Sequence, residues 1–145
     1  MAQGTLRYQI LVKSISLLLL VLFVYAATSK LLLFDQFKIQ LSKSPFISDH
    51  AGWLALIIPF MEYVISGLFL FPKYVLTALY ASFSILLLFT LYIFLVLNFS
   101  TTVPCSCGGI IANLDWKEHF VFNTVCILLS LIGISSYRKL KQHQI

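Results

Sequence analysis

Apolar residues run in long stretches along this chain and do not alternate with polar ones. Four stretches are long enough to cross a membrane, at about 8–34, 51–71, 74–97 and 118–137. A helix needs roughly 20 mostly apolar residues to span the hydrocarbon core of a bilayer. Because lipid offers the backbone no hydrogen bonds, such runs form helices, whereas the strands of a membrane barrel would alternate apolar and polar side chains. The pattern predicts an all-α integral membrane protein with a four-helix transmembrane bundle.

A shorter segment after the first stretch has an amphipathic pattern. Phe34, Phe37 and Leu41 recur at spacings of three and four residues, which places them on one face of a helix. Pro45 would end such a helix, because proline has no backbone N–H to donate. We therefore expect a short helix over 35–44 that lies at the membrane interface.

Composition excludes most soluble classes. Hydrophobic residues make up 60% of the 145 residues and charged residues only 10%, whereas a soluble domain carries about 25% charge. So few charged residues cannot cover a water-facing surface, and they are too few for a disordered chain. Three cysteines are also too few for a secreted fold of this length to be stabilised by disulfides. The net charge of +5 would suggest nucleic acid for a soluble protein, but these basic residues lie mostly in tails and loops. We expect no nucleic-acid partner and a single membrane domain over residues 1–145.

The distribution of Lys and Arg predicts the orientation, because cytoplasmic segments carry an excess of basic residues. With both termini in the cytoplasm, the inner segments hold six basic residues and the outer segments three, or four if Lys30 is counted with them. The inner set is Arg7, Lys13, Lys73, Arg138, Lys139 and Lys141, and the outer set is Lys38, Lys43 and Lys117. We therefore expect both termini to be cytoplasmic. The first run is longer than the core of a signal peptide, so we expect it to be kept as a span.

Candidate chemistry lies at Cys105 and Cys107, which one serine separates in the loop predicted to face outward. Disulfides prefer a Cα separation of roughly 4.4–6.8 Å, and a fully extended step of two residues approaches or exceeds that range. A bridge would therefore require a bend, which Gly108 and Gly109 permit. It would close almost no loop and gain little stability, so the pair suits electron exchange better than stapling.

Other interpretations of these cysteines remain open. Two thiolates with His119 or His50 could hold Cu(I) or Zn²⁺, but no second cysteine pair completes a four-ligand set, and we assign no metal site. The pair could also be incidental to a turn of small residues. Cys126 lies within the fourth apolar run, where a thiol normally behaves as a small hydrophobic group. Its alternative role is a third thiol that relays to the outer pair.

Two charged residues fall inside the apolar runs. Glu62 lies near the centre of the second run, and Lys30 lies roughly one turn from the outer end of the first. A charge inside a bilayer costs about 2.5–3.5 kcal/mol and therefore seeks a partner or water. Lys30 could pair with Glu62 or extend to the interface. Glu62 could be a protonated acid bonded to a neighbouring helix, or could accept a proton released by thiol oxidation. Pro59 should kink the same helix, and Gly67 should allow close helix contact.

Taken in order, several motifs resemble the MauE/DoxX family of bacterial membrane proteins, and the MauE branch most closely. They are Ala27-Thr28-Ser29-Lys30-Leu31, the amphipathic segment with Phe37, the stretch Pro59-x-x-Glu62-x-x-x-x-Gly67, and Cys105-x-Cys107-x-Gly109. The resemblance extends from the first span to the fourth, and it implies a four-helix domain in the bacterial inner membrane. This chain departs from the family pattern at Gly108, where an aromatic residue often follows the second cysteine, and in the extra thiol of Cys126.

The resemblance also implies work with another protein. In the methylamine system, family members act with a thioredoxin-like partner in maturing a disulfide-rich periplasmic dehydrogenase subunit. Cys105 and Cys107 match the family's cysteine pair, and Lys30 and Glu62 match its intramembrane polar residues. We therefore expect thiol–disulfide exchange with a thioredoxin-like or maturing periplasmic protein. The chain would either oxidise that partner, passing electrons to quinone, or reduce it; no quinone motif is visible. The alternative is a non-enzymatic membrane subunit or scaffold that assists assembly, maturation or transport of a partner.

Overall fold

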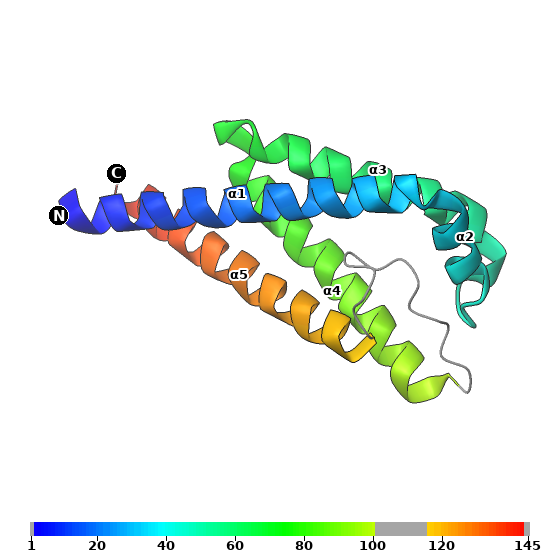
Figure 1. Ribbon diagram of the computed structural model, residues 1–145. Coiled ribbons are helices and arrows are strands. Elements are labelled where there is room, and N and C mark those ends of the chain that lie inside the picture. The colour runs from blue at the N-terminus through cyan, green and yellow to red at the C-terminus, as the bar shows by residue number, and fades with distance from the viewer. Residues whose placement is uncertain (1, 101–115, 144–145) are drawn as a thin grey trace.

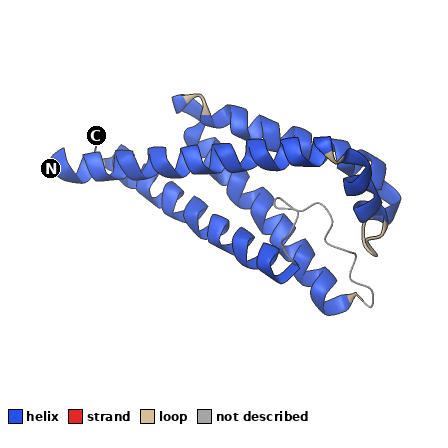
Figure 2. Cartoon of the chain, in the orientation of Figure 1, coloured by secondary structure: helices blue, strands red, loops and turns tan. Residues whose placement is uncertain are grey.

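The computed structural model describes residues 2–100 and 116–143, and every element in them is a helix (Figure 2). The long helices are α1 (Ala2–Leu32), α3 (Ala51–Phe69), α4 (Val75–Phe99) and α5 (Trp116–Gln142). Shorter ones are α2 (Phe34–Ser42) and the 3-10 turns Ser48–His50 and Pro72–Tyr74. Four segments are long and apolar enough to cross a membrane: Gly4–Leu32, Ser48–Phe69, Pro72–Phe99 and Trp116–Gln142. The predicted all-α membrane fold with four spanning helices is confirmed.

The helices extend beyond the apolar runs from which they were predicted. The first helix begins at Ala2 although its apolar run begins near residue 8, and α5 continues to Gln142, past the expected end at 137. An apolar run marks the part of a helix that lies in lipid, whereas the helix itself can continue wherever its backbone bonds persist. The second span also continues as one helix through Pro59; the kink expected there stays a prediction.

The four long helices pack chiefly as two pairs, α1 with α3 and α4 with α5, and α1 also packs against α5 (Figure 1). Both termini lie at the same end of the molecule (Figure 1). At that end the Tyr8 and His143 rings stack with centroids 6.2 Å apart, and Lys139 Nζ lies 5.7 Å from the Tyr8 centroid. Four crossings thus return the chain to its starting side; that this side is the cytoplasm stays a prediction.

A glycine brings α5 close to two other helices. A Cβ built on Gly133 would lie 2.9 Å from Leu79 Cδ2 in α4 and 3.3 Å from Ile15 Cγ2 in α1. No side chain larger than hydrogen fits there unless its neighbours shift. A Cβ on Gly67 would meet no described atom within 4 Å, so the expectation that Gly67 permits close helix contact is wrong. Sequence identifies a small residue, but only packing shows whether it faces another helix.

The short amphipathic helix forms as predicted, as α2, and it packs on one end of the bundle (Figure 1). Phe37 and Leu41 are buried against Ala51 and Ala55 of α3, with Phe34 partly buried beside them. This confirms the apolar face inferred from their spacing. The loop after α2 is held to α4, because the Tyr92 hydroxyl donates a hydrogen bond to the buried Ser44 hydroxyl. At the end opposite the termini, α2 therefore covers the ends of α1 and α3.

Candidate functional site: a polar group at the head of an intramembrane cavity

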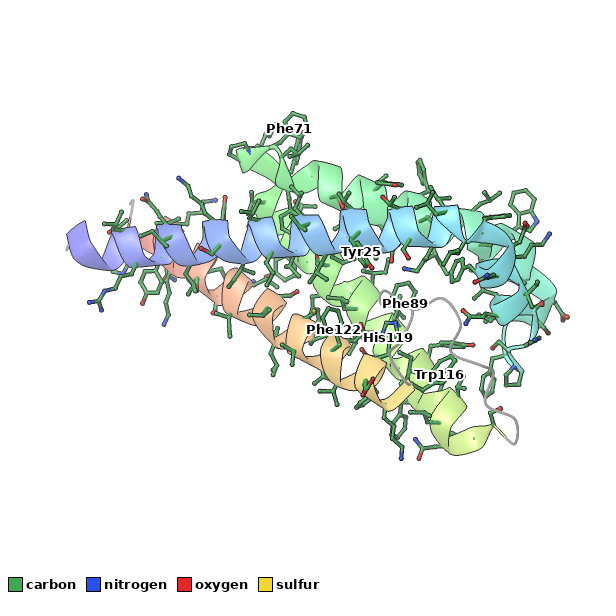
Figure 3. The ribbon with its side chains drawn as sticks, in the orientation of Figure 1. Tyr25, Phe71, Phe89, Trp116, His119 and Phe122 are labelled. Atoms are coloured by element: carbon green, nitrogen blue, oxygen red, sulfur yellow. The ribbon has the colours of Figure 1, made fainter. Side chains whose placement is uncertain are left out.

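A cavity of about 770 Å³ lies between the helices, and α1, α2, α3, α4 and α5 all contribute to its wall. Most of its lining is apolar, including Leu19, Phe23, Ile65, Leu86 and Ile93. Figure 3 shows aromatic and imidazole rings gathered along α4 and α5, and these rings line the same cavity: Phe89, Trp116, His119 and Phe122. The volume is within the range of small-molecule sites, roughly 300–1,000 Å³. The cavity is therefore large enough to hold a ligand.

Lys30 and Glu62 form an ion pair in the wall of this cavity. Lys30 Nζ donates to Glu62 Oε1 at 2.7 Å, and the two side chains are 11% and 2% exposed. The ammonium group also lies 5.9 Å from the Phe37 centroid and 6.0 Å from the Phe89 centroid, within cation–π range. Of the two alternatives for Lys30, pairing with Glu62 is the one the structure adopts. The second carboxylate oxygen, Oε2, has no hydrogen-bond partner among residues 2–100 and 116–143.

Close packing of α1 on α3 brings the two charges together. Ala26 and Ala27, one turn before Lys30, are fully buried, and so is Ala55 of α3. Small side chains let helix backbones approach within a membrane. A hydrogen bond beside the ion pair links the same two helices: Thr28 Oγ1 and the Tyr63 hydroxyl are 2.7 Å apart. Because Thr28 donates its own proton to the Val24 carbonyl oxygen, Tyr63 is the donor in this contact.

One face of α5 adds further polar side chains to the wall of the cavity. His119, Asn123 and Cys126 follow one another at spacings of four and three residues, and all three line the cavity. Asn123 is 2% exposed and Cys126 is 3% exposed. In the described part of the chain, neither His119 Nδ1 nor Asn123 Oδ1 has a hydrogen-bond partner, although both atoms are buried. Together with Glu62 Oε2, the wall of the cavity therefore holds three buried polar atoms that have no hydrogen-bond partner among the described residues.

The sequence predictions do not include this face of α5: they give His119 only as a possible metal ligand and do not name Asn123 as a site residue. The available signal was the series 119, 123, 126 and 130, which places polar or small side chains on one stripe of a helix. Ser130 continues the stripe and donates its hydroxyl to the Cys126 carbonyl oxygen. Such a stripe on a membrane helix indicates a buried polar face.

The other sequence-predicted residues have different outcomes. Cys105 and Cys107 lie outside the described residues, as do Gly108 and Gly109. Cys126 is a buried free thiol in the hydrophobic core, as expected of a small apolar side chain. His50 is exposed and does not line the cavity that His119 lines. Within residues 2–100 and 116–143, no group of three or more His, Cys, Asp or Glu side chains could hold a metal ion. The proposed roles of Cys105, Cys107, Glu62 and Lys30 in catalysis stay proposals.

Comparison with known proteins places this architecture in a family. The model of the methylamine utilisation protein MauE matches residues 8–136, a range that contains most or all of each long helix, the Lys30–Glu62 pair and the positions of Cys105 and Cys107. Neither a curated protein nor a solved structure matches the chain. The match covers most of the sequence and agrees with the resemblance found in its motifs. The chain is therefore a multi-pass membrane protein that belongs to the MauE family of methylamine utilisation proteins.

Proposed function

We propose that this protein assists maturation of a periplasmic protein by thiol–disulfide exchange at Cys105 and Cys107. The observation that carries the proposal is the family match over residues 8–136, which includes both cysteines. The partner is a thioredoxin-like protein or a disulfide-rich subunit of the methylamine dehydrogenase type. The protein works in the bacterial inner membrane, with its termini in the cytoplasm and the segment between α4 and α5 on the periplasmic side.

The exchange follows ordinary disulfide chemistry. In the oxidising direction, a partner thiolate attacks one sulfur of a Cys105–Cys107 disulfide and forms a mixed disulfide. A second partner thiolate then displaces the bound cysteine. The partner gains a disulfide, and Cys105 and Cys107 become a dithiol that has taken up two electrons and two protons. In the reducing direction the same steps run backward from a partner disulfide.

We assign Glu62 the role of proton acceptor and Lys30 that of its positioning partner. Reoxidation of a dithiol releases two protons, and an ionised carboxylate can accept one. Glu62 suits this role because Oε1 is held by Lys30 while Oε2 is without a described partner beside the cavity. The ion pair also lowers the cost of keeping an ionised carboxylate inside the membrane. This assignment explains why a lysine and a glutamate occupy otherwise apolar spans.

Differential alkylation of the full chain in intact cells tests the proposal. Free thiols are blocked, disulfides are reduced, and the released thiols are labelled and located by mass spectrometry. We expect Cys105 and Cys107 to be found partly as a disulfide, and a Cys105→Ser or Cys107→Ser variant to accumulate a mixed disulfide with a partner. The matched control is Cys126→Ala, which removes the buried third thiol and should leave the Cys105–Cys107 disulfide detectable.

Two results would contradict the exchange. One is a pair that stays fully reduced under all conditions, and the other is a Cys105→Ser/Cys107→Ser variant that matures the partner normally. Either result favours the non-enzymatic membrane scaffold, which needs no exchanging thiols.

A further inference from the structure

The cavity described above has an apolar body and a polar head. Its body is formed by aliphatic and aromatic side chains of the bundle core, among them Leu19, Ile65 and Leu86. Its head is formed by Lys30, Glu62, His119 and Asn123. Apolar walls with a few convergent polar groups are typical of small-molecule sites. A fitting ligand therefore has an apolar tail and a small polar head.

Hydrogen-bonding capacity narrows the chemistry of the head. Glu62 Oε2 and Asn123 Oδ1 accept hydrogen bonds, and His119 Nδ1 can accept or donate according to its tautomer. None of these atoms has a partner among the residues the structure describes. A buried polar atom left without a partner destabilises the protein, because it has lost its hydrogen bonds to water. A ligand that brings hydroxyl donors to these atoms would remove that cost.

The charge and the aromatic walls of the cavity further restrict the chemistry of the ligand head. Of the described side chains that line the cavity, only Lys30 carries a fixed positive charge, and it already binds Glu62. The pair is neutral overall, so a neutral head is favoured over the phosphate of a phospholipid. Aromatic rings surround the polar groups, with Phe37 and Phe89 on the Lys30 side and Trp116 and Phe122 on the α5 side. Such walls favour a flat ring, because aromatic groups stack on one another.

We propose that this cavity binds a lipid-soluble quinone and its quinol. The quinol hydroxyls donate to Glu62 Oε2 and His119 Nδ1, and the quinone carbonyls accept from Lys30 Nζ and the Asn123 amide N–H. The isoprenoid tail occupies the apolar body between α1, α3 and α4. The assignment needs a neutral head that hydrogen-bonds to the Lys30–Glu62 pair and to α5, and an apolar tail that is buried among the core side chains.

This inference rests on the proposed function. With quinone as the electron acceptor, the thiol–disulfide exchange runs in the direction that oxidises the partner protein. Oxidation of the Cys105–Cys107 dithiol to a disulfide forms one S–S bond, breaks two S–H bonds and releases two electrons and two protons. Reduction of a quinone to a quinol takes up two electrons and two protons and converts two carbonyls to hydroxyls. The two half-reactions balance, with the quinone as the oxidant.

Tryptophan fluorescence provides a direct test of binding. The chain has two tryptophans: Trp116 lines the cavity, whereas Trp53 is 74% exposed. A Trp53→Phe variant therefore leaves Trp116 as a single reporter. The full chain is purified into phosphatidylcholine nanodiscs free of quinone and titrated with decylubiquinone, whose ring quenches indole emission. We expect saturable quenching, whereas quinone that merely partitions into lipid quenches without saturation.

Variants of the cavity head supply the specificity control. Asn123→Leu and His119→Phe, each in the Trp53→Phe background, should weaken apparent quinone affinity about tenfold, the loss expected for one hydrogen bond to a buried group. The matched control is Asn98→Leu, because the Asn98 amide donates to the Phe94 carbonyl oxygen of its own helix and Asn98 is not among the described residues that line the cavity. Circular dichroism selects the variants that keep their helix content.

Each result of this test is decisive. Saturable quenching that weakens in Asn123→Leu or His119→Phe and persists in Asn98→Leu supports the proposal. Unsaturable quenching, equal quenching in all variants, or a phospholipid that co-purifies and is not displaced by quinone overturns it. A Cys105→Ser/Cys107→Ser variant separates the two proposals, since it should still bind quinone. If the chain binds quinone but Cys105 and Cys107 exchange no disulfide, only the proposed function is contradicted. If the cysteines exchange but the chain binds no quinone, only this inference is contradicted.

Discussion

Lys30 Nζ lies 2.7 Å from Glu62 Oε1 and thereby joins the last turn of α1 to the middle of α3. The carboxylate is almost completely buried and the ammonium nearly so. Only one carboxylate oxygen is used in the pair, and the other borders the cavity without a partner among the described residues. The same contact therefore holds two spanning helices together and presents an unsatisfied acceptor to a site that can hold a ligand.

Removing one member of this pair should destabilise the protein far more than removing both. Lys30→Met leaves Glu62 as an uncompensated buried charge, and we expect a loss of about 3–5 kcal/mol in the free energy of unfolding. The double variant Lys30→Met/Glu62→Met should recover most of that loss. Unfolding in mixed detergent, followed by circular dichroism, measures both. The control is Lys38→Met, whose side chain is exposed; equal losses in Lys30→Met and in the double variant would contradict the prediction.

Substitutions at two helical glycines should differ in effect. Gly133→Val places atoms against Leu79 and Ile15, where even a Cβ would come within 2.9 Å of its nearest neighbour. We expect a loss of about 1–3 kcal/mol, typical of overpacking. Gly67→Val points into open space among the described atoms and should change stability by less than about 0.5 kcal/mol. Thermal unfolding in detergent compares the two, and Leu79→Ala should partly rescue Gly133→Val. Equal effects at both glycines would show that helix propensity, not packing, governs these positions.

Two tyrosine hydroxyls offer another matched comparison. Tyr92→Phe removes the donor to the buried Ser44 hydroxyl and should cost about 1–3 kcal/mol, because that group is left unpaired. Tyr80→Phe removes an acceptor from Arg138 Nη2, at 2.5 Å, in an exposed contact. Its cost should be below about 0.5 kcal/mol. Denaturant unfolding of both variants checks the order, and a larger loss for Tyr80→Phe would contradict it.

Thiol accessibility tests the orientation of the chain. In reduced spheroplasts, a membrane-impermeant maleimide should label Cys105 and Cys107, because the loop that carries them is proposed to face the periplasm. Cys126 should react only after denaturation, since its side chain is buried in the helix core. Mass spectrometry of the labelled chain counts the modified thiols. Labelling of Cys105 and Cys107 only after lysis would contradict the proposed orientation.

Local pattern was sufficient for the elements of this fold. Uninterrupted apolar runs predicted the four spanning helices because a bilayer forces the backbone to satisfy its own hydrogen bonds. The spacing of Phe37 and Leu41 predicted α2 and its buried face. The order of short motifs around Lys30, Glu62, Cys105 and Cys107 indicated the family to which the chain belongs. Each of these inferences depends on residues close together in the chain or on their order.

Tertiary structure alone decided which helix faces meet. The sequence left Lys30 with two equal alternatives, and the packing of α1 on α3 selected its pairing with Glu62. The sequence indicated Gly67 as the glycine at a helix contact, whereas the close approach between helices occurs at Gly133. It also gave no reason to connect His119 and Asn123 with Glu62, and all three line one cavity. Lipid makes every spanning helix apolar around most of its surface, so hydrophobicity does not distinguish the face turned to lipid from the face turned to protein, and only packing can.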